Sequence, residues 1–323
     1  QRRSKIAKPN IHELLELAKD FDPAVQDLSP LTNEASGRKY FRAQSNNKSF
    51  VVCWAPEGID QSTFFRLSKA LSDHRIKAPE ILAFSENNNV SFQSDLGDKS
   101  LIYDLEFYKN EKTFQSVIEA IVTIQKAKIK DIPKITINRL REQAGLIKNV
   151  FFENFLDLDT PQYIEELIDV FSERLMTHPQ ANSHTDFERR NLFILPDETV
   201  AVIDFQDLCM TSIGTDLAGI SIDHYSEINH PLIDKGTSNY VSFSKQDISF
   251  EDMQTIILEA GVHRNMRILG TLARLYTESS LTFRLKDLPQ ILNNLSEILL
   301  LLGHDNSIFK ETRTNLQQRL EVS

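Results

Sequence analysis

The spacing of apolar and polar residues predicts strands in the first hundred residues and helices in most of the remaining chain. Apolar positions in residues 11–20 recur on one helical face, and Asn10 with Glu13 has the pattern of a capping box at its start. Short β-rich runs with Asn-containing turns then predict a hairpin of residues 40–44 and 49–54, a helix over 61–73, and a hairpin of residues 80–85 and 90–94.

Beyond residue 98 the apolar positions recur mostly with helical spacing. They predict helices over residues 113–126, 138–155, 162–176, 252–260, 263–278 and 288–302. One more hairpin is expected, because β-rich residues 191–195 and 200–205 flank a turn sequence. The whole pattern predicts an α+β fold with a β-rich N-terminal lobe over residues 1–96 and a helical C-terminal lobe over 97–323, joined by a hinge at 94–98.

Three polar residues around the last hairpin have the spacing of a phosphotransfer site. Asn191 follows Asp186 by five residues and Asp204 follows thirteen later, the spacing by which kinase-type enzymes hold a base and two metal ligands. Strand pairing predicts that Asn191 and Asp204 lie about 5 Å apart at one end of the hairpin, where both can bind Mg²⁺. Asp186 is then the expected base, accepting the proton of the acceptor hydroxyl.

The alternative is that these residues belong to chance strings around an ordinary hairpin. His184 would then be a core histidine and Asp204 a turn residue. Either motif alone, residues 184–191 or 203–207, is compatible with that interpretation. The two motifs at this spacing, followed by a helix start at Gly214, favour the phosphotransfer site. Asp216 is interpreted as a helix N-cap rather than a site residue.

A candidate phosphate loop precedes the first predicted hairpin. Ser36 and Gly37 are small enough for backbone N–H groups to approach phosphate oxygens, and Arg38 or Lys39 could meet the phosphate charge. A turn with a solvated basic pair is the alternative. Ser94 and Leu96, in the predicted hinge, complete the expected ATP-binding residues.

Composition narrows the class of protein. A chain of 323 residues is long enough for two domains or one two-lobed enzyme, and its net charge of -10 argues against a nucleic-acid partner. Cys53 and Cys209 have no metal or redox spacing, which favours reduced thiols in a cytoplasmic protein. The apolar stretch 298–302 is far too short to span a membrane. These features indicate no particular oligomeric state.

The motifs together resemble the aminoglycoside phosphotransferase superfamily. Within it the chain is most similar to cell-wall amino-sugar kinases that phosphorylate the anomeric hydroxyl of N-acetylmuramate and N-acetylglucosamine. The similarity is carried by the stretches 35–42, 55–57, 95–97, 184–192, 203–207 and 264–275. It implies a protein-kinase-like two-lobed fold, ATP with Mg²⁺, and a role for Arg190 in stabilising the transferred charge, although a surface salt bridge is an alternative for Arg190.

The chain departs from related enzymes in two places. Protein kinases pair a strand Lys with a helix Glu to hold the nucleotide phosphates, but residues 49–54 contain no Lys and residues 61–73 no Glu. Arg38 is the expected substitute. Leu208, Thr211 and Thr215 stand where a small residue, Gly and Tyr are expected, so the acceptor pocket is predicted to differ.

The resulting prediction is an ATP-dependent kinase for a small-molecule sugar. A nucleotide-binding pseudokinase or scaffold is the alternative, favoured by the missing Lys–Glu pair and opposed by the intact carboxylates, which repel one another without a cation. An aminoglycoside or other small-alcohol kinase is a third possibility. The sequence Asp-Phe-Gln-Asp at residues 204–207 opposes it. Candidate acceptor contacts are Asp207 and, in the helical lobe, Glu142, Arg267 and Arg274, and for these last three a helix-surface charge is the alternative.

Overall fold

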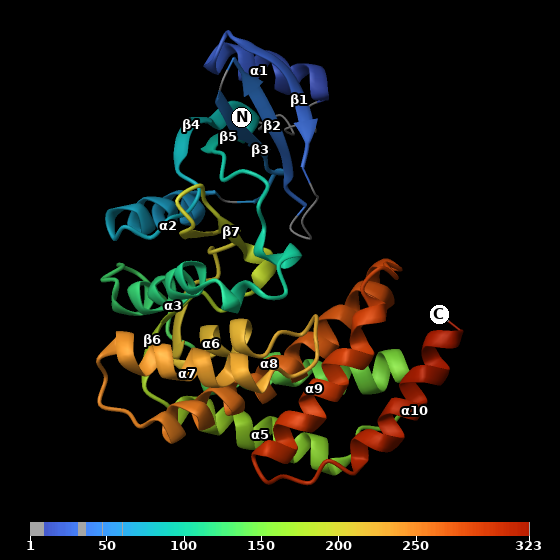
Figure 1. Cartoon of the computed structure of the whole chain (residues 1–323). Helices are drawn as coiled ribbons and strands as arrows, with labels where there is room; N and C mark the ends of the chain where they lie inside the picture. Colours follow the sequence, from blue (N-terminus) through green and yellow to red (C-terminus); the bar gives the residue numbers. More distant parts are fainter. Residues whose placement is uncertain (1–9, 32–36, 47, 60, 323) are drawn as a thin grey trace. The chain divides into compact units, whose positions relative to one another are not determined.

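The computed structural model describes residues 10–31, 37–46, 48–59 and 61–322. Contacts divide the chain into two compact units (Figure 1). The first unit comprises residues up to 103 together with 192–206, and the second comprises 104–191 with 207 onward.

The first unit is built on one antiparallel sheet of five strands in the order β1-β2-β3-β5-β4. The strands are β1 Val25–Pro30, β2 Lys39–Ser45, β3 Lys48–Trp54, β4 Ile81–Ser85 and β5 Val90–Ser94. Both predicted hairpins are present. Strand β1 was not predicted, because a register shift between Val25 and Asp27 leaves Val25 and Leu28 buried three residues apart instead of two.

Two helices accompany the sheet, α1 Ile11–Phe21 and α2 Ser62–Asp73. The predicted capping box of α1 is present: Asn10 Oδ1 accepts from Glu13 N at 2.9 Å, and Glu13 Oε2 accepts from Asn10 N at 2.8 Å. Buried residues of α1 and the sheet form one apolar cluster of Leu14, Ala18, Val25, Leu28, Ala43, Phe50, Val52, Trp54, Val90 and Phe92. Burial of this cluster removes apolar surface from water and fixes the sheet register.

The hairpin β7 Leu192–Ile194 and β8 Val200–Val202 groups with the first unit although it follows much of the second in sequence. Ile194 N donates to Lys99 O and Val202 N to Lys77 O, both at 2.8 Å. The strands are shorter than predicted. Asn191 ends a 3₁₀ turn, η5 Arg189–Asn191, directly before β7, and Asp204 follows β8 with φ +62°.

The second unit is mainly helical. Its helices are α3 Glu111–Lys126, α4 Ile137–Ala144, the π-helix η4 Ile147–Leu156, α5 Gln162–Thr177, α6 Gly214–Ser221, α7 His230–Ser244, α8 Phe250–Ser279, α9 Leu288–Leu301 and α10 Ile308–Glu321. Strands β6 Gln180–Ser183 and β9 Cys209–Ser212 pair antiparallel. Short 3₁₀ turns are η1 Glu86–Asn88 and η2 Leu101–Tyr103 in the first unit, and η3 Phe107–Lys109 and η6 Leu285–Asp287 in the second. Helices α7 and α10 and strands β6 and β9 were not predicted.

Two helix predictions were wrong in detail. The helix expected over 138–155 is α4 followed by the π-helix η4. The helices expected over 252–260 and 263–278 are one helix, α8, which runs through the second unit (Figure 1). Gly261 looked like a break in the pattern but lies inside α8, where a Cβ would come within 2.4 Å of Ile222 Cδ1. The glycine therefore permits close packing rather than ending the helix.

Both cysteines, Cys53 and Cys209, are buried free thiols. Among the helices of the described residues, none is both long and apolar enough to cross a bilayer.

Gly270→Ala is expected to destabilise the protein. Alanine normally stabilises a helix interior by about 1 kcal/mol relative to glycine. At Gly270, however, a Cβ would lie 2.3 Å from the backbone oxygen of Leu146. We expect the free energy of unfolding to fall by about 1–3 kcal/mol in denaturant titrations. The neighbouring exposed variant Thr271→Ala should stay within about 0.5 kcal/mol of wild type, and a more stable Gly270→Ala protein would show that α8 and η4 are not closely packed there.

Candidate active site

Residues 184–191 form a loop between β6 and β7 that carries most of the predicted catalytic residues, and we call it the catalytic loop. Thr185 has φ +72°, a left-handed conformation that β-branched residues rarely adopt. The buried carboxylate of Asp216, on α6, holds this conformation: Oδ1 accepts from Ser183 Oγ at 2.7 Å and Thr185 N at 2.9 Å, and Oδ2 accepts from His184 N at 2.8 Å. Burial raises the pKa of Asp216, while the donated hydrogen bonds oppose that rise.

Asp186 is half-buried and ion-paired with Arg267 of α8. Arg267 Nη2 donates to Asp186 Oδ1 at 3.0 Å and to the carbonyl oxygen of Thr185 at 3.4 Å. Burial raises the pKa of the Asp186 carboxyl, but the charges of Arg267 and Arg264 outweigh this and leave the pKa below its usual value. The carboxylate is therefore ionised at neutral pH and can accept a proton.

Glu188 is a buried carboxylate on the same loop. It accepts from Arg264 Nη2 at 2.8 Å and lies 3.4 Å from His224 Nδ1. Burial raises the pKa of Glu188 and lowers that of His224, whose neighbours Arg264 and Arg284 also disfavour the charged imidazole. The interaction is thus a buried Arg264–Glu188 ion pair beside a neutral histidine.

Arg190 extends from the loop to Tyr225. Its guanidinium carbon lies 5.4 Å from the centre of the Tyr225 ring, and Nη2 donates to the Tyr225 hydroxyl. Arg190 Nε is 3.8 Å from Glu188, and 47% of its side chain is exposed. The side chain is held by an aromatic ring with its charge near the surface, and its role in transfer stays a prediction.

Asn191 and Asp204 present oxygen atoms of the kind that Mg²⁺ binds. Asn191 Nδ2 donates to the carbonyl oxygen of Asp186 at 2.9 Å, so Oδ1 is the amide atom left to act as a ligand. Asp204 Oδ1 accepts from Gln206 Nε2 at 2.5 Å. No group of three His, Cys, Asp or Glu side chains in the described part of the chain could hold a metal. A carboxylate and an amide fit Mg²⁺ that takes its other ligands from phosphate and water.

Among the candidate nucleotide residues of the first unit, Arg38 packs against Phe64 of α2. Arg38 is 7% exposed, and its guanidinium carbon lies 5.7 Å from the Phe64 ring centre. Phe205 stacks on the same ring at 4.8 Å between centres, which ties the segment after Asp204 to α2. Gly37 has φ +76°, a conformation that suits a glycine turn. Ser36 lies outside the described residues.

The hinge segment is fixed to the sheet by Asp95. Its carboxylate accepts from Arg42 Nε at 2.6 Å, Ser49 Oγ at 2.6 Å and Gly97 N at 2.9 Å. Ser94 ends β5, where its hydroxyl accepts from Glu80 N at 2.9 Å, and Leu96 is half-buried two residues later. Their predicted contacts with ATP stay predictions.

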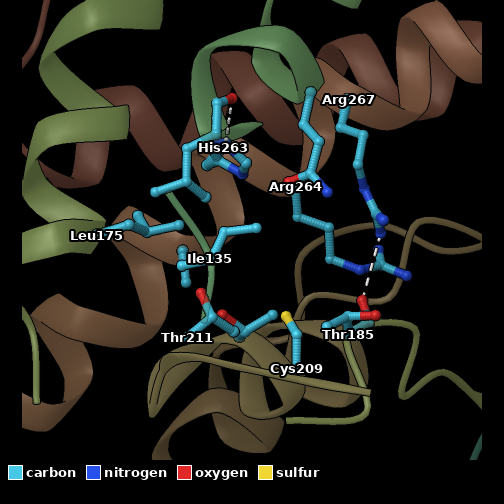
Figure 2. A pocket seen from close by; sticks show the side chains of 12 residues that line it. Ile135, Leu175, Thr185, Cys209, Thr211, His263, Arg264 and Arg267 are labelled. Atoms are coloured by element: carbon cyan, nitrogen blue, oxygen red, sulfur yellow. Dashed lines mark hydrogen bonds between the residues drawn. The ribbon is translucent and has the colours of Figure 1, made fainter. Parts of the chain in front are cut away.

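A small cavity lies behind the catalytic loop, between α8 and β9 (Figure 2). Its volume is about 30 Å³. The lining residues are Ile135, Leu140, Gln143, Leu175, Thr185, Cys209, Thr211, Thr215, Ala260, His263, Arg264 and Arg267. Burial raises the pKa of the Cys209 thiol to about 11, so this thiol is uncharged at neutral pH. Thr211 and Thr215, where the sequence departs from related enzymes, both line this cavity.

The four candidate acceptor residues lie in different surroundings. Arg267 contacts Asp186 as described. Asp207 is exposed, and its carbonyl oxygen accepts from Thr185 Oγ1 at 3.4 Å. Glu142 pairs with Arg139 at 3.1 Å on the exposed side of α4, and Arg274 lies 3.4 Å from Glu278 on α8. The structure thus brings Arg267 to Asp186 and gives Glu142 and Arg274 surface partners.

Sequence reasoning missed three residues that shape the loop: Asp216, Glu188 and Arg264. Asp216 was interpreted as a helix cap, although its carboxylate accepts hydrogen bonds from three donors outside its own helix. Glu188 lies inside the motif that was recognised, but its partner Arg264 is 76 residues away in sequence. Glu188 and Arg264 lie within the stretches that carry the resemblance, but the burial and the partners of these three residues are not visible in the sequence.

Comparison with known proteins shows the family to which the chain belongs. Residues 27–240 match the phosphotransferase enzyme family, and the chain belongs to this family. It is 24% identical over 280 residues to the N-acetylmuramate/N-acetylglucosamine kinase of Pseudomonas aeruginosa, which covers 83% of this chain and 82% of that protein. The kinase of the same name from Neisseria meningitidis is 23% identical over 288 residues, covering 84% and 85%. The resemblance inferred from the motifs is confirmed.

Solved structures confirm the protein-kinase-like fold. A choline kinase from Streptococcus pneumoniae has a TM-score of 0.64 and 14% identity, covering 87% of this chain and 97% of that chain. A spectinomycin phosphotransferase in complex with ADP and spectinomycin has a TM-score of 0.61 and 12% identity, covering 98% and 100%. The chain is therefore a phosphotransferase of this family, whose acceptor group is a hydroxyl.

Asp216→Asn is expected to disable the catalytic loop. The variant replaces an oxygen that accepts hydrogen bonds with an N–H group facing buried donors, so the free energy of unfolding should fall by about 2–4 kcal/mol. Turnover should fall roughly 10²-fold or more, because the base is displaced. Thermal unfolding and steady-state kinetics measure both effects. The exposed variant Glu173→Gln is the control, and unchanged values for Asp216→Asn would show that Thr185 keeps its conformation without the carboxylate.

Proposed function

We propose that the protein transfers the γ-phosphoryl group of ATP to the anomeric hydroxyl of an N-acetylated amino sugar, N-acetylmuramate or N-acetylglucosamine. The observation that carries the chemistry is the ionised Asp186 on a braced loop, five residues before Asn191. The choice of acceptor is supported by the similarity, over more than four fifths of the chain, to kinases named for these sugars.

In the proposed reaction the acceptor oxygen attacks the γ-phosphorus. A P–O bond forms there, and the bond from the γ-phosphorus to the bridging oxygen of ADP breaks. Asp186 receives the proton of the acceptor hydroxyl as the new P–O bond forms. The fixed Asp186 carboxylate also orients the acceptor. This contributes to the rate because it places the reacting oxygen in position to attack the γ-phosphorus.

Asn191 and Asp204 are the proposed ligands of Mg²⁺, which neutralises phosphate charge when bound. They stand immediately before β7 and shortly after β8, and register pairs Leu192 with Val202 at that end of the hairpin. Gln206 orients Asp204 through its hydrogen bond, as residues beside metal ligands commonly do.

Arg38 is the proposed phosphate contact in place of the missing strand lysine. Within the described residues its guanidinium is buried against Phe64 and has no carboxylate partner. A buried cation without an anion carries a desolvation penalty that a bound phosphate would offset. Gly37, Ser94 and Leu96 are proposed to line the rest of the nucleotide site, with residues 1–96 and 97–323 acting as the two lobes.

Asp204→Asn tests the metal assignment. The substitution keeps the size of the side chain but removes the charge that Mg²⁺ needs, so affinity for the nucleotide in the presence of Mg²⁺ should fall roughly tenfold or more and turnover should be lost. Calorimetry with and without Mg²⁺ measures this. Asp197→Asn is the matched control, because Asp197 is an exposed carboxylate of the same hairpin paired with Lys77 at 2.6 Å. Equal affinities for Asp204→Asn and wild type would remove Asp204 from the metal site.

The acceptor is tested with a panel of sugars, aminoglycosides and choline in an ATP turnover assay. N-acetylmuramate or N-acetylglucosamine should be consumed, and the 1-O-methyl glycoside, which lacks a free anomeric hydroxyl, should not react. The product should release phosphate in mild acid, because a phosphate on an acetal carbon leaves readily. An acid-stable product, or phosphorylation of the methyl glycoside, would refute anomeric transfer. Turnover of aminoglycosides alone would assign a different acceptor to the same chemistry.

A further inference from the structure

Helix α8 carries two arginines, one turn apart, that contact alternate residues of the catalytic loop. Arg264 binds Glu188 at 2.8 Å, and Arg267 binds Asp186 at 3.0 Å. Both side chains point from α8 toward β9 and the loop, beside the cavity (Figure 2). Residues three apart lie on the same face of a helix, so one helix face fixes both carboxylates.

The two contacts differ in burial and therefore in what they can do. Arg264 is 4% exposed, and its guanidinium also lies 3.3 Å from His224 Nδ1. Because both partners are buried, the Arg264–Glu188 pair serves as an internal anchor of the loop. The Arg267 side chain is 22% exposed and that of Asp186 is 42% exposed. This second pair is open enough for the Asp186 carboxylate to meet an acceptor.

We propose that Arg267 is the positioning residue of the base, acting on the acceptor through Asp186. This inference rests on the proposed role of Asp186. Nη2 of Arg267 bridges Asp186 Oδ1 and the carbonyl oxygen of Thr185, which ties the carboxylate to its own loop backbone. With Oδ1 held in this way, Oδ2 is the oxygen that receives the proton of the acceptor hydroxyl.

The bridge matters because a free aspartate can rotate about its side-chain bonds. A displacement of the reacting groups of about 1 Å can lower the rate roughly 10²-fold. Arg267 removes this freedom through two acceptors that belong to consecutive residues. A lysine keeps the charge but is a compact point donor without the planar fork, so it can restore only part of the effect.

A double-mutant cycle tests the proposal. The variants are Arg267→Gln, Arg267→Lys, Asp186→Asn and the double variant Arg267→Gln/Asp186→Asn, measured by single-turnover phosphoryl transfer with the acceptor identified in the panel. Arg267→Gln should lower the transfer rate roughly 10- to 100-fold with little change in KM for the sugar, and Arg267→Lys should lie between it and wild type. In the Asp186→Asn background, Arg267→Gln should reduce the rate by less than about twofold, because its target is gone.

The control variant is Arg141→Gln. Arg141 pairs with Asp169 at 2.8 Å and Glu173 at 3.0 Å on the surface, so it tests the loss of an ion pair alone and should leave the rate unchanged. Nucleotide affinity by calorimetry should be the same for wild type and Arg267→Gln. If Arg267→Gln does not fold, Arg267→Lys replaces it in the cycle.

Three results would overturn the proposal. Independent, additive losses in the cycle would mean that Arg267 does not act through Asp186. A rise in KM for the sugar with an unchanged transfer rate would mean that Arg267 binds the acceptor directly. A parallel loss of nucleotide affinity would mean a general structural role. If no N-acetylated sugar reacts, the proposed function fails, and the cycle is then measured on the slow hydrolysis of ATP, where water takes the place of the acceptor.

Discussion

The catalytic loop depends on the buried carboxylate of Asp216. Thr185 adopts a left-handed backbone that a β-branched residue resists, and such strain persists only where surrounding contacts hold it. Three donors from residues 183–185 converge on Asp216 and supply those contacts. The left-handed backbone at Thr185 turns the chain between β6 and Asp186. The position of Asp186 relative to β6 is therefore fixed.

Helix α8 can hold the other side of this loop because its glycines allow close approach. Gly261 packs against Ile222 and Gly270 against the backbone at Leu146. Between these two contacts lie Arg264 and Arg267, whose charges reach the carboxylates of the loop. Packing and electrostatics thus act through one helix: its glycines allow close packing, and its arginines hold the pKa of the Asp186 carboxyl below its usual value.

The sequence predicted what depends on local patterns. Strand alternation found two hairpins of the sheet, and motif spacing singled out Asp186, Asn191 and Asp204, whose roles stay predictions. It missed β1, where a bulge disturbs the alternation, and it divided α8 at a glycine that serves packing. It also missed the hydrogen bonds that Asp216 accepts from residues 183–185, and it missed the Arg264–Glu188 pair. The partners in these contacts lie 31 to 76 residues apart. Such contacts leave no local periodicity, because they are fixed by tertiary packing.

Two of the departures expected from the sequence, Thr211 and Thr215, lie on the wall of the cavity, and neither takes part in the hydrogen bonds by which Asp216 holds the catalytic loop. Thr215 precedes Asp216 on α6, yet its hydroxyl takes no part in the hydrogen bonds between Asp216 and the catalytic loop. It has no partner among the described residues. Thr211 lies on β9 in the same wall. A buried hydroxyl without a partner is a group that a water or a ligand oxygen can satisfy. A water or ligand oxygen bound to the Thr215 hydroxyl would therefore share this cavity with Arg267, whose side chain contacts Asp186.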